Sequence, residues 1–349
     1  MRGHALRSPL QRMLEDEIRS QNVLGAVAAI TRQGSDPIEL AVGFKDREHT
    51  RPMRIESRFP IWSISKTCIA VVVLKLAEQK ILELEDRLGR WLPEFEFARS
   101  ANIRQTLNHT SGLPDYGALP LYAQGVRDRK DPWNYNQFLE HTCSHGLLFD
   151  PGERGSYSNI GYMALCRLIE VATGQTLTEL IRSEIAVPLR LTQTAVVQNA
   201  EDFDALAPGY SRFLDLSGPL TDVREWFHPG WVAHGFLAST ATEVNRFMEG
   251  IFTGNLLEQD SLAEMLRLVP IPHQSDHAGY GLGIASEIHP DYGRHYGHEG
   301  SGCGYRVIAS HILQLQGQGT TISVFLNSDE GNPRLIVDAL LGLLQSHVT

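Results

Sequence analysis

Apolar residues near both ends of the chain follow the continuous or alternating pattern of β-strands. Residues 24–32 and 38–44 flank a turn rich in Gly, Ser, Asp and Pro, and this order predicts a hairpin. Residues 305–312 and 320–327 flank the sequence Gln-Gly-Gln-Gly and predict a second hairpin. Strands at both ends with helices between them indicate a sheet that the two ends of the chain build together.

Other apolar stretches have the spacing of helices. Ser8, followed by Pro9, has the character of an N-cap and predicts a helix that begins there. Residues 63–80 are apolar nearly all round, which is typical of a buried helix. A second buried helix is predicted over residues 159–172, and a closing helix is predicted to begin at Pro333.

Together these elements predict an α/β sandwich with a helical insertion. Residues 1–85 and 266–349 are expected to form the sandwich domain. Residues 86–265 mix helical patches with long polar loops and are expected to form a mostly helical inserted domain. The chain has 349 residues, 42% of them apolar, which is enough to bury a substantial core.

The charge balance is acidic, with 31 basic residues against 41 acidic ones and a net charge of −10. A protein that binds nucleic acid normally carries a basic excess or a basic stripe, and the sequence shows neither. Nucleic acid is therefore not expected as a partner, and the acidity is typical of a soluble surface.

Several features of the sequence predict a cytoplasmic protein. No apolar run approaches the ~20 residues that a membrane span needs. Residues 1–10 lack the apolar segment of a signal peptide, so we expect the cytoplasm, or the periplasm if an export signal has been removed. The cysteines form no C-x-x-C pair and are expected to be reduced thiols. They are Cys68, Cys143, Cys166 and Cys303.

The first motif with chemical character is Ser63-Ile64-Ser65-Lys66, at the start of the predicted buried helix. Positions three apart on a helix lie one turn apart on the same face, so the Lys66 amine is expected to reach the Ser63 hydroxyl. A serine is a weak nucleophile until a neighbouring base takes its proton. Burial would lower the pKa of the lysine and leave part of it neutral. With 23 serines and five lysines in the chain, such a spacing alone is weak evidence.

The second motif is Tyr157-Ser158-Asn159, which contains the only Tyr-x-Asn of the chain. A tyrosine beside a lysine can pass a proton between a nucleophile and a leaving group. An asparagine two residues further on can donate a hydrogen bond to a substrate carbonyl. In isolation, this stretch is equally typical of a helix N-cap that follows a half-buried tyrosine.

The third motif is Gly297-His298-Glu299-Gly300-Ser301-Gly302, which we expect to form a loop just before the first C-terminal strand. Glycines allow a ligand to lie against the backbone, and a backbone N–H beyond Gly300 can contribute to an oxyanion hole. His298 is a candidate for anchoring the substrate.

The order and spacing of the three motifs resemble those of the serine β-lactamase and penicillin-binding-protein superfamily. The forms Tyr-Ser-Asn and His-Glu-Gly are similar to the branch of class C β-lactamases, D,D-carboxypeptidases and family VIII esterases. Further stretches resemble segments of that branch, so the resemblance runs from about residue 24 to the end. They are residues 107–116 (LNHTSGLPDY), 188–194 (PLRLTQT), 235–240 (GFLAST) and 280–283 (YGLG).

The resemblance implies an antiparallel sheet flanked by helices, with the site in a cleft beside the inserted domain. It implies Ser63 as the nucleophile, Lys66 as the adjacent base and Tyr157 as the general acid or base. Which of Lys66 and Tyr157 takes the serine proton stays open, because such pairs titrate together.

Substrate-binding roles follow from the same resemblance. Asn159 would contact the substrate amide or carbonyl, and His298 stands where many members have a lysine. Gly300 lies beside the backbone N–H of Ser301, which with that of Ser63 would form the oxyanion hole. No cofactor and no metal are implied.

The expected substrate is a small ester, amide or D-peptide, and an esterase or amide hydrolase is the first hypothesis. A D,D-carboxypeptidase, a D-aminopeptidase or a β-lactamase would use the same residues. His298 weakens the β-lactamase alternative because it replaces a permanently charged lysine. Glu299 would repel anionic substrates unless its side chain points away.

Three other classes are less favoured. An α/β-hydrolase would show G-x-S-x-G, which the chain lacks. A zinc hydrolase has only the pairs His141/His145 and His273/His277 to support it, without H-E-x-x-H. A catalytically silent scaffold with this fold is the non-enzyme alternative, and the joint presence of the motif residues argues against it.

Overall fold

The computed structural model of the chain describes residues 2–95, 98–270 and 278–346. In this part of the chain, the central element is a seven-stranded sheet in which every neighbouring pair is antiparallel. The strand order is β2-β1-β12-β11-β10-β9-β8. The strands are β1 (Gly25–Arg32), β2 (Ile38–Gly43), β8 (Gly279–Tyr280), β9 (Ala285–His289), β10 (Gly293–Gly302), β11 (Tyr305–Leu315) and β12 (Gln318–Leu326).

Strands from the two ends of the chain pair inside this sheet, as its second and third members. β1 pairs with β12 over seven residues, from Ala26 opposite Leu326 to Arg32 opposite Thr320. Both strands are largely buried, but only β1 is mostly apolar, since β12 also carries Thr320, Thr321 and Ser323. The two predicted hairpins, β1–β2 and β11–β12, are confirmed.

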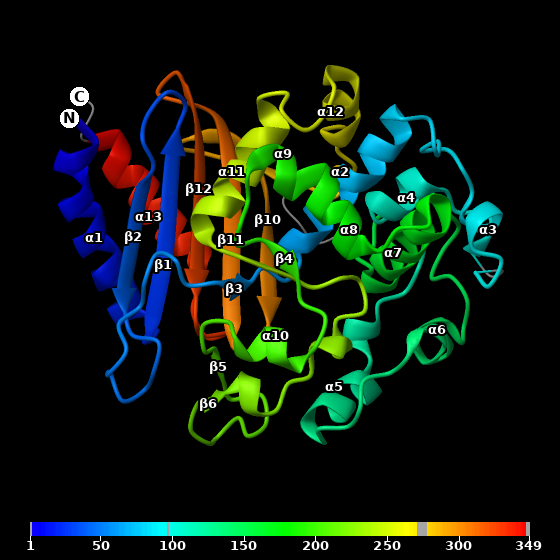
Figure 1. Cartoon of the computed structure of the whole chain (residues 1–349), viewed down its shortest axis with the longest axis horizontal. Helices are drawn as coiled ribbons and strands as arrows, with labels where there is room; N and C mark the ends of the chain where they lie inside the picture. The colour runs from blue at the N-terminus through cyan, green and yellow to red at the C-terminus, as the bar shows by residue number, and fades with distance from the viewer. Residues whose placement is uncertain (1, 96–97, 271–277, 347–349) are drawn as a thin grey trace.

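Helices cover both faces of the sheet and complete a three-layer arrangement (Figure 1). On one face, α1 (Arg2–Ser20) packs beside α13 (Pro333–Ser346) over one core. On the other face lie α2 (Ile64–Glu78), α7 (Asn159–Thr173) and α11 (Ala241–Phe252). Successive residues of β1 enter opposite cores because strand side chains alternate between faces. The predicted fold class, an antiparallel sheet flanked by helices, is confirmed.

A buried asparagine on α11 fixes this helix to the sheet. Asn245 donates to the carbonyls of Ala29 and Thr321 at 2.9 and 3.2 Å and accepts from the Ser323 hydroxyl at 2.6 Å. α11 lies within residues 86–265 yet packs on the sheet. The division of the chain at residues 85 and 266 stays a prediction.

The remaining elements are short and mostly form the region beside the sheet. Two small sheets contain β3 (Phe59–Pro60), β7 (Leu237–Ser239) and β4 (Ala195–Val196), and β5 (Tyr210–Ser211) with β6 (Thr221–Asp222). The other helices are α3 (Leu88–Trp91), α4 (Ile103–Leu107), η2 (Tyr116–Ala118), α5 (Pro120–Arg127), α6 (Tyr135–Cys143), α8 (Leu177–Ile181), η3 (Arg182–Ala186), α9 (Val187–Leu189), α10 (Ala200–Asp204), η4 (Val223–Glu225), η5 (Pro229–Trp231) and α12 (Gln259–Met265).

Two expectations about the elements are wrong. The first helix begins at Arg2 instead of Ser8, so Pro9 lies inside it. The motif at residues 297–302 is part of strand β10, although its glycines predicted a loop. Here the glycines serve the close approach of neighbouring backbone, and the strand is held by pairing with β9 and β11.

The helices of the described residues include no segment long and apolar enough to cross a membrane.

Candidate active site

Ser63 lies at the start of the buried helix α2, at the point where the chain turns sharply into it. Trp62 has a left-handed backbone with φ of 43°, which is rare for a bulky residue and marks a constrained turn. The next residue, Ser63, is already helical, with φ of −70° and ψ of −11°. Thr67, one turn further along, donates to the carbonyl of Gly283 at 2.7 Å. The position of Ser63 is therefore set by a rigid, fully packed helix.

The Ser63 hydroxyl oxygen has two hydrogen-bond donors. Lys66 Nζ lies 3.1 Å from Ser63 Oγ, and the Tyr157 hydroxyl donates to the same oxygen at 2.8 Å. The ammonium nitrogen also lies 5.0 Å from the centre of the Tyr157 ring. Two proton-carrying groups thus converge on one serine oxygen.

Burial shifts the pKa values of Lys66 and Tyr157 in opposite directions. It lowers the pKa of Lys66 to about 7, because the charged form loses its hydration, while the Asp115 carboxylate acts in the opposite direction. Burial raises the pKa of Tyr157, so the phenol keeps its proton at neutral pH. The lysine is therefore the partner that becomes neutral near pH 7.

A buried histidine that the sequence analysis did not single out contacts the lysine. His234 Nε2 lies 3.0 Å from Lys66 Nζ, and its Nδ1 lies 3.1 Å from the hydroxyl of Tyr116. Tyr116 belongs to the LNHTSGLPDY stretch, and His234 directly precedes the GFLAST stretch. Their positions beside family-like segments are the only sequence signal for either residue.

Asn159 reaches the site from the first turn of α7 and is held by a carboxylate. Its backbone and side-chain nitrogens donate to Asp115 Oδ1 at 3.0 and 2.9 Å. Asp115 belongs to the family-like stretch at residues 107–116, but the sequence did not indicate its role. The amide of Asn159 is thus oriented before any substrate arrives.

His298 lies on β10 as a buried, neutral side chain. Its Nδ1 donates to the carbonyl of Glu299 at 2.6 Å, so its Nε2 accepts from the Tyr280 hydroxyl at 2.8 Å. Burial and the charge of Lys66 lower the pKa of His298 to about 4. His298 therefore offers no positive charge to a substrate at neutral pH.

The carboxylate of Glu299 is turned away from the site and paired. Arg334 of α13 donates to it through Nε at 2.9 Å, and the same guanidinium pairs with Glu287 at 2.7 Å. The expected repulsion of anionic substrates by Glu299 is therefore not supported.

The glycines of the third motif let β10 lie directly against the turn that carries Ser63. A Cβ on Gly300 would stand 2.5 Å from the carbonyl oxygen of Ile61, and one on Gly302 would stand 2.5 Å from the Trp62 ring. Both distances are too short for any side chain. As a result, Ser301 and Ser63 border the same hollow.

His109 packs against the ring of Tyr157. It is buried, with a left-handed φ of 62°, and its Nδ1 accepts from the backbone N–H of Ser158 at 3.2 Å. The centres of the His109 and Tyr157 rings lie 4.3 Å apart. Among the described residues, His109 Nε2 has no hydrogen-bond partner.

Two hollows flank this cluster. The one that contains Ser63, Asn159 and Ser301 has a volume of about 210 Å³. Aromatic side chains form much of its wall, and they are Trp62, Tyr116, Tyr122, Phe213 and Phe227. A second hollow of about 430 Å³ lies on the other side of Tyr157, between His298 and Arg334.

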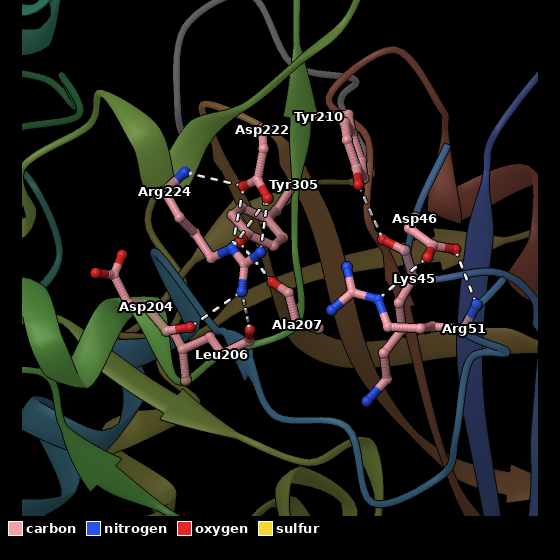
Figure 2. Close-up of polar contacts among 10 residues, drawn as sticks. All are labelled: Lys45, Asp46, Arg51, Asp204, Leu206, Ala207, Tyr210, Asp222, Arg224 and Tyr305. Atoms are coloured by element: carbon pink, nitrogen blue, oxygen red, sulfur yellow. Dashed lines mark hydrogen bonds and ion pairs between the residues drawn. The ribbon is translucent and has the colours of Figure 1, made fainter. Parts of the chain in front are cut away.

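Polar contacts join residues 204–224, which include Phe213 of the aromatic wall, to Tyr305 at the start of β11 (Figure 2). Arg224 pairs with Asp222 at 2.6 Å and donates to the carbonyl of Leu206 at 3.2 Å. Tyr305, just beyond the turn that follows Ser301, donates to the carbonyl of Ala207 at 2.7 Å. These bonds hold the wall and the β10–β11 turn in one rigid arrangement.

Metal binding has no support among the described residues, which include no group of three or more His, Cys, Asp or Glu side chains suited to an ion. The pair His273 and His277 lies outside the described residues.

Comparisons with known proteins agree with the class that this fold and cluster define, the serine hydrolases that work through an acyl-serine. A family model described as Beta-lactamase matches residues 10–346. The chain belongs to the β-lactamase family, and the predicted resemblance is confirmed.

Relatives within the family differ in what they act on, and the chain covers some of them only in part. It is 28% identical to penicillin-binding protein 4* of Bacillus subtilis, over 86% of this chain and 67% of that one. It is 32% identical to the esterase EstB of Burkholderia gladioli, over 55% of this chain and 52% of that one. A D-stereospecific amidohydrolase from Streptomyces sp. has a similar structure, with a TM-score of 0.82, 26% identity and coverage of 95% and 98%.

Proposed function

We propose that this chain hydrolyses small esters or amides through an acyl intermediate on Ser63. The observation that carries the proposal is the pair of hydrogen bonds to Ser63 Oγ, from Lys66 Nζ at 3.1 Å and from the Tyr157 hydroxyl at 2.8 Å. A serine held between a low-pKa amine and a phenol has both a base and an acid available.

Two proton transfers accompany the acylation of Ser63. The neutral amine of Lys66 takes the proton of the Ser63 hydroxyl while Oγ forms a bond to the acyl carbon. Tyr157 donates its proton to the departing oxygen or nitrogen as that bond breaks, which leaves Lys66 as an ammonium and Tyr157 as a phenolate. In deacylation, water attacks the acyl carbon and gives a proton to the Tyr157 phenolate, and the Lys66 ammonium returns a proton to Ser63 Oγ as the acid is released. The pKa of Lys66, lowered to about 7 by burial, favours it over Tyr157 as the base.

Two backbone N–H groups are the proposed oxyanion hole, those of Ser63 and Ser301. Both residues border the 210 Å³ hollow, and Ser63 stands at the N-terminus of the 15-residue helix α2. The free N–H groups of such a terminus favour a developing negative charge. Asn159, held by Asp115, is the proposed contact for the substrate carbonyl or amide.

The walls of the hollow favour an aromatic or apolar acyl group without negative charge. Among the described residues that line it there is no lysine or arginine, and His298 is neutral nearby. Aromatic D-amino acid amides are a second candidate, because the Asp115 carboxylate beside Asn159 suits an ammonium group. A D-stereospecific relative in the family supports this candidate.

The test is the hydrolysis of a neutral p-nitrophenyl ester, D-phenylalanine amide and a carboxylate-bearing β-lactam. We expect Ser63→Ala to lower kcat/KM for the ester by at least about 10⁴-fold. Ser35→Ala, at an exposed serine in the β1–β2 turn, is the matched control and should behave like the unchanged protein. Intact-protein mass spectrometry should show an acyl adduct that Ser63→Ala lacks. Turnover that survives in Ser63→Ala would refute the proposal.

We also propose a cytoplasmic location. The described cysteines are free, and three of the four are buried, which suits a reducing compartment. Fractionation of the source cells tests this proposal, and recovery of the protein with periplasmic markers would contradict it.

A further inference from the structure

His234 has no role in the proposed mechanism, although it lies beside Lys66. It lies in the loop just before β7, is 4% exposed, and its Nε2 lies 3.0 Å from Lys66 Nζ. Its own carbonyl accepts from the thiol of Cys166 at 3.0 Å, which helps to fix the backbone there. Such a buried imidazole needs partners for both ring nitrogens, and it has them in Lys66 and Tyr116.

We propose that His234 is a positioning residue that orients the amine of Lys66 toward Ser63, with Tyr116 selecting the tautomer that does so. This inference rests on the proposed function. A neutral amine has a single lone pair, and that lone pair must face the Ser63 hydroxyl to take its proton. If His234 Nε2 accepts an N–H of Lys66, the lone pair stays free for Ser63. If Nε2 carries the proton instead, it donates to the same lone pair and blocks the base.

The tautomer of His234 depends on Tyr116. For Nε2 to accept, Nδ1 must carry the proton and donate it to the Tyr116 oxygen, 3.1 Å away. Burial raises the pKa of Tyr116 well above its ordinary value, so the phenol keeps its own proton. Because Tyr116 also borders the 210 Å³ hollow, its O–H can point into that hollow while its oxygen accepts from Nδ1. In that arrangement the second ring nitrogen fixes the role of the first, as in other imidazole sites.

An imidazole suits this position better than a carboxylate would. Burial and the charge of Lys66 hold the pKa of His234 well below its ordinary value, so it stays neutral beside the lysine. A carboxylate there would raise the pKa of Lys66 and keep the amine charged at neutral pH. Within the described part of the chain, no acidic side chain forms an ion pair with Lys66.

Other titratable groups also face the lysine, and a pH effect must be judged against them. They come from the loops before α7 and η2, from α7, and from strand β10. They are His109, Asp115, Tyr157, Tyr162, Cys166 and His298. Among the described residues, only His234 and Ser63 form a hydrogen bond with Nζ, so these two set the direction of its lone pair.

The experiment compares His234→Met, which fills the space without an acceptor, with His234→Gln, whose side-chain oxygen can replace Nε2. We expect His234→Met to lower kcat for the p-nitrophenyl ester by about 30- to 100-fold with KM changed less than about twofold. The acid limb of its pH profile should move to lower pH, because the ammonium has lost an acceptor. His234→Gln should recover at least about tenfold of the loss. His145→Met, at an exposed histidine, is the control.

Tyr116→Phe is a second variant that keeps the ring against Tyr122 and Phe138 and removes only the hydroxyl. We expect kcat to fall by about tenfold, because the blocking tautomer is no longer disfavoured. An unchanged kcat in both His234→Met and Tyr116→Phe would overturn the inference. Equal losses in His234→Met and His234→Gln, with unchanged pH profiles, would overturn it too. If Ser63→Ala remains active, the proposed function fails instead, so the two failures are distinguishable.

Discussion

At the scale of single residues, the site is a small set of buried groups whose protonation states differ because of where they lie. Lys66 is fully buried, and burial lowers its pKa to about 7. His298 is also buried and Tyr157 is half-buried, and the loss of hydration keeps the phenol protonated and the imidazole neutral. In water, the amine of Lys66 and the phenol of Tyr157 would both be protonated at neutral pH. Desolvation makes the amine available as a base and keeps the phenol available as an acid.

This sorting predicts a pH dependence of the reaction. Because Lys66 must be neutral to act as the base, kcat/KM should rise by about tenfold per pH unit below pH 7 and become level above it. His298, with its pKa lowered to about 4, should not contribute to the profile between pH 5 and 9. The measurement is ester hydrolysis across this range, with circular dichroism as a check on folding. A flat profile, or a limb near pH 10, would contradict the role given to Lys66.

At the scale of elements, the critical contact is between strand β10 and the turn that leads into α2. Trp62 of that turn packs on Phe227 and Phe236, with ring centres 5.6 and 5.0 Å away. Gly300 and Gly302 let the strand backbone reach the turn itself. The two halves of the proposed oxyanion hole come from these two elements, so their spacing decides whether the hole exists.

We therefore expect Gly300→Ala to impair function more than the addition of one methyl group usually does. The new methyl group would stand 2.5 Å from both Ile61 O and Val307 Cγ2, so β10 or the turn must move. We expect a loss of about 100-fold or more in kcat/KM and a destabilisation of about 1–3 kcal/mol. Rates are measured on folded protein below its melting temperature.

The matched control is Gly342→Ala on α13, where an added Cβ meets nothing within 4 Å. This change should leave activity unaltered and stabilise the helix by about 0.5–1 kcal/mol. Normal activity in Gly300→Ala would show that the spacing of β10 and the turn tolerates change.

At the scale of the whole molecule, the sheet separates two cores with different consequences for function. The core under α1 and α13 lies on one face, and the core that contains α2 lies on the other, together with the cluster around Ser63 (Figure 1). Damage to the first core should therefore change the stability of the protein more than the chemistry of the site.

Leu340→Ala on α13 tests this separation. Leu340 is fully buried against the sheet, and its truncation should lower the free energy of unfolding by about 2–5 kcal/mol. The kcat/KM of the folded protein should stay within about twofold of the original. Leu335→Ala, on the same helix but 53% exposed, should change neither quantity appreciably. Chemical denaturation and ester hydrolysis are the two measurements. A large loss of activity at full folding would show that the two faces are coupled.

Much of this arrangement follows from short-range patterns in the sequence. The uniformly apolar stretch after Ser63 could only be a buried helix, and the three-residue spacing to Lys66 then brought the amine to the serine oxygen. The two hairpins followed from apolar runs around turn residues. The helix from Asn159 ends at Gly174 with a φ of 70°, as a C-terminal glycine predicts.

Patterns of this kind mislead where local preference and packing disagree. Ser8 and Pro9 have the local character of a helix start, yet the helix already runs through them from Arg2. The glycines at residues 297–302 are typical of a loop, yet pairing with β9 and β11 keeps them in a strand. At residues 297–302, pairing with the adjacent strands of the chain outweighs the local preference of the glycines.

The sequence by itself determined the helix that carries Ser63, the motif residues and the family, because each depends on residues close together along the chain. Only the tertiary structure decided that His234, 168 residues from Lys66, contacts its amine, and that Glu299 turns away to Arg334. It also decided that Gly300 lies against Ile61. Contacts of this kind arise when separate elements pack over a common core, and no spacing along a single element encodes them.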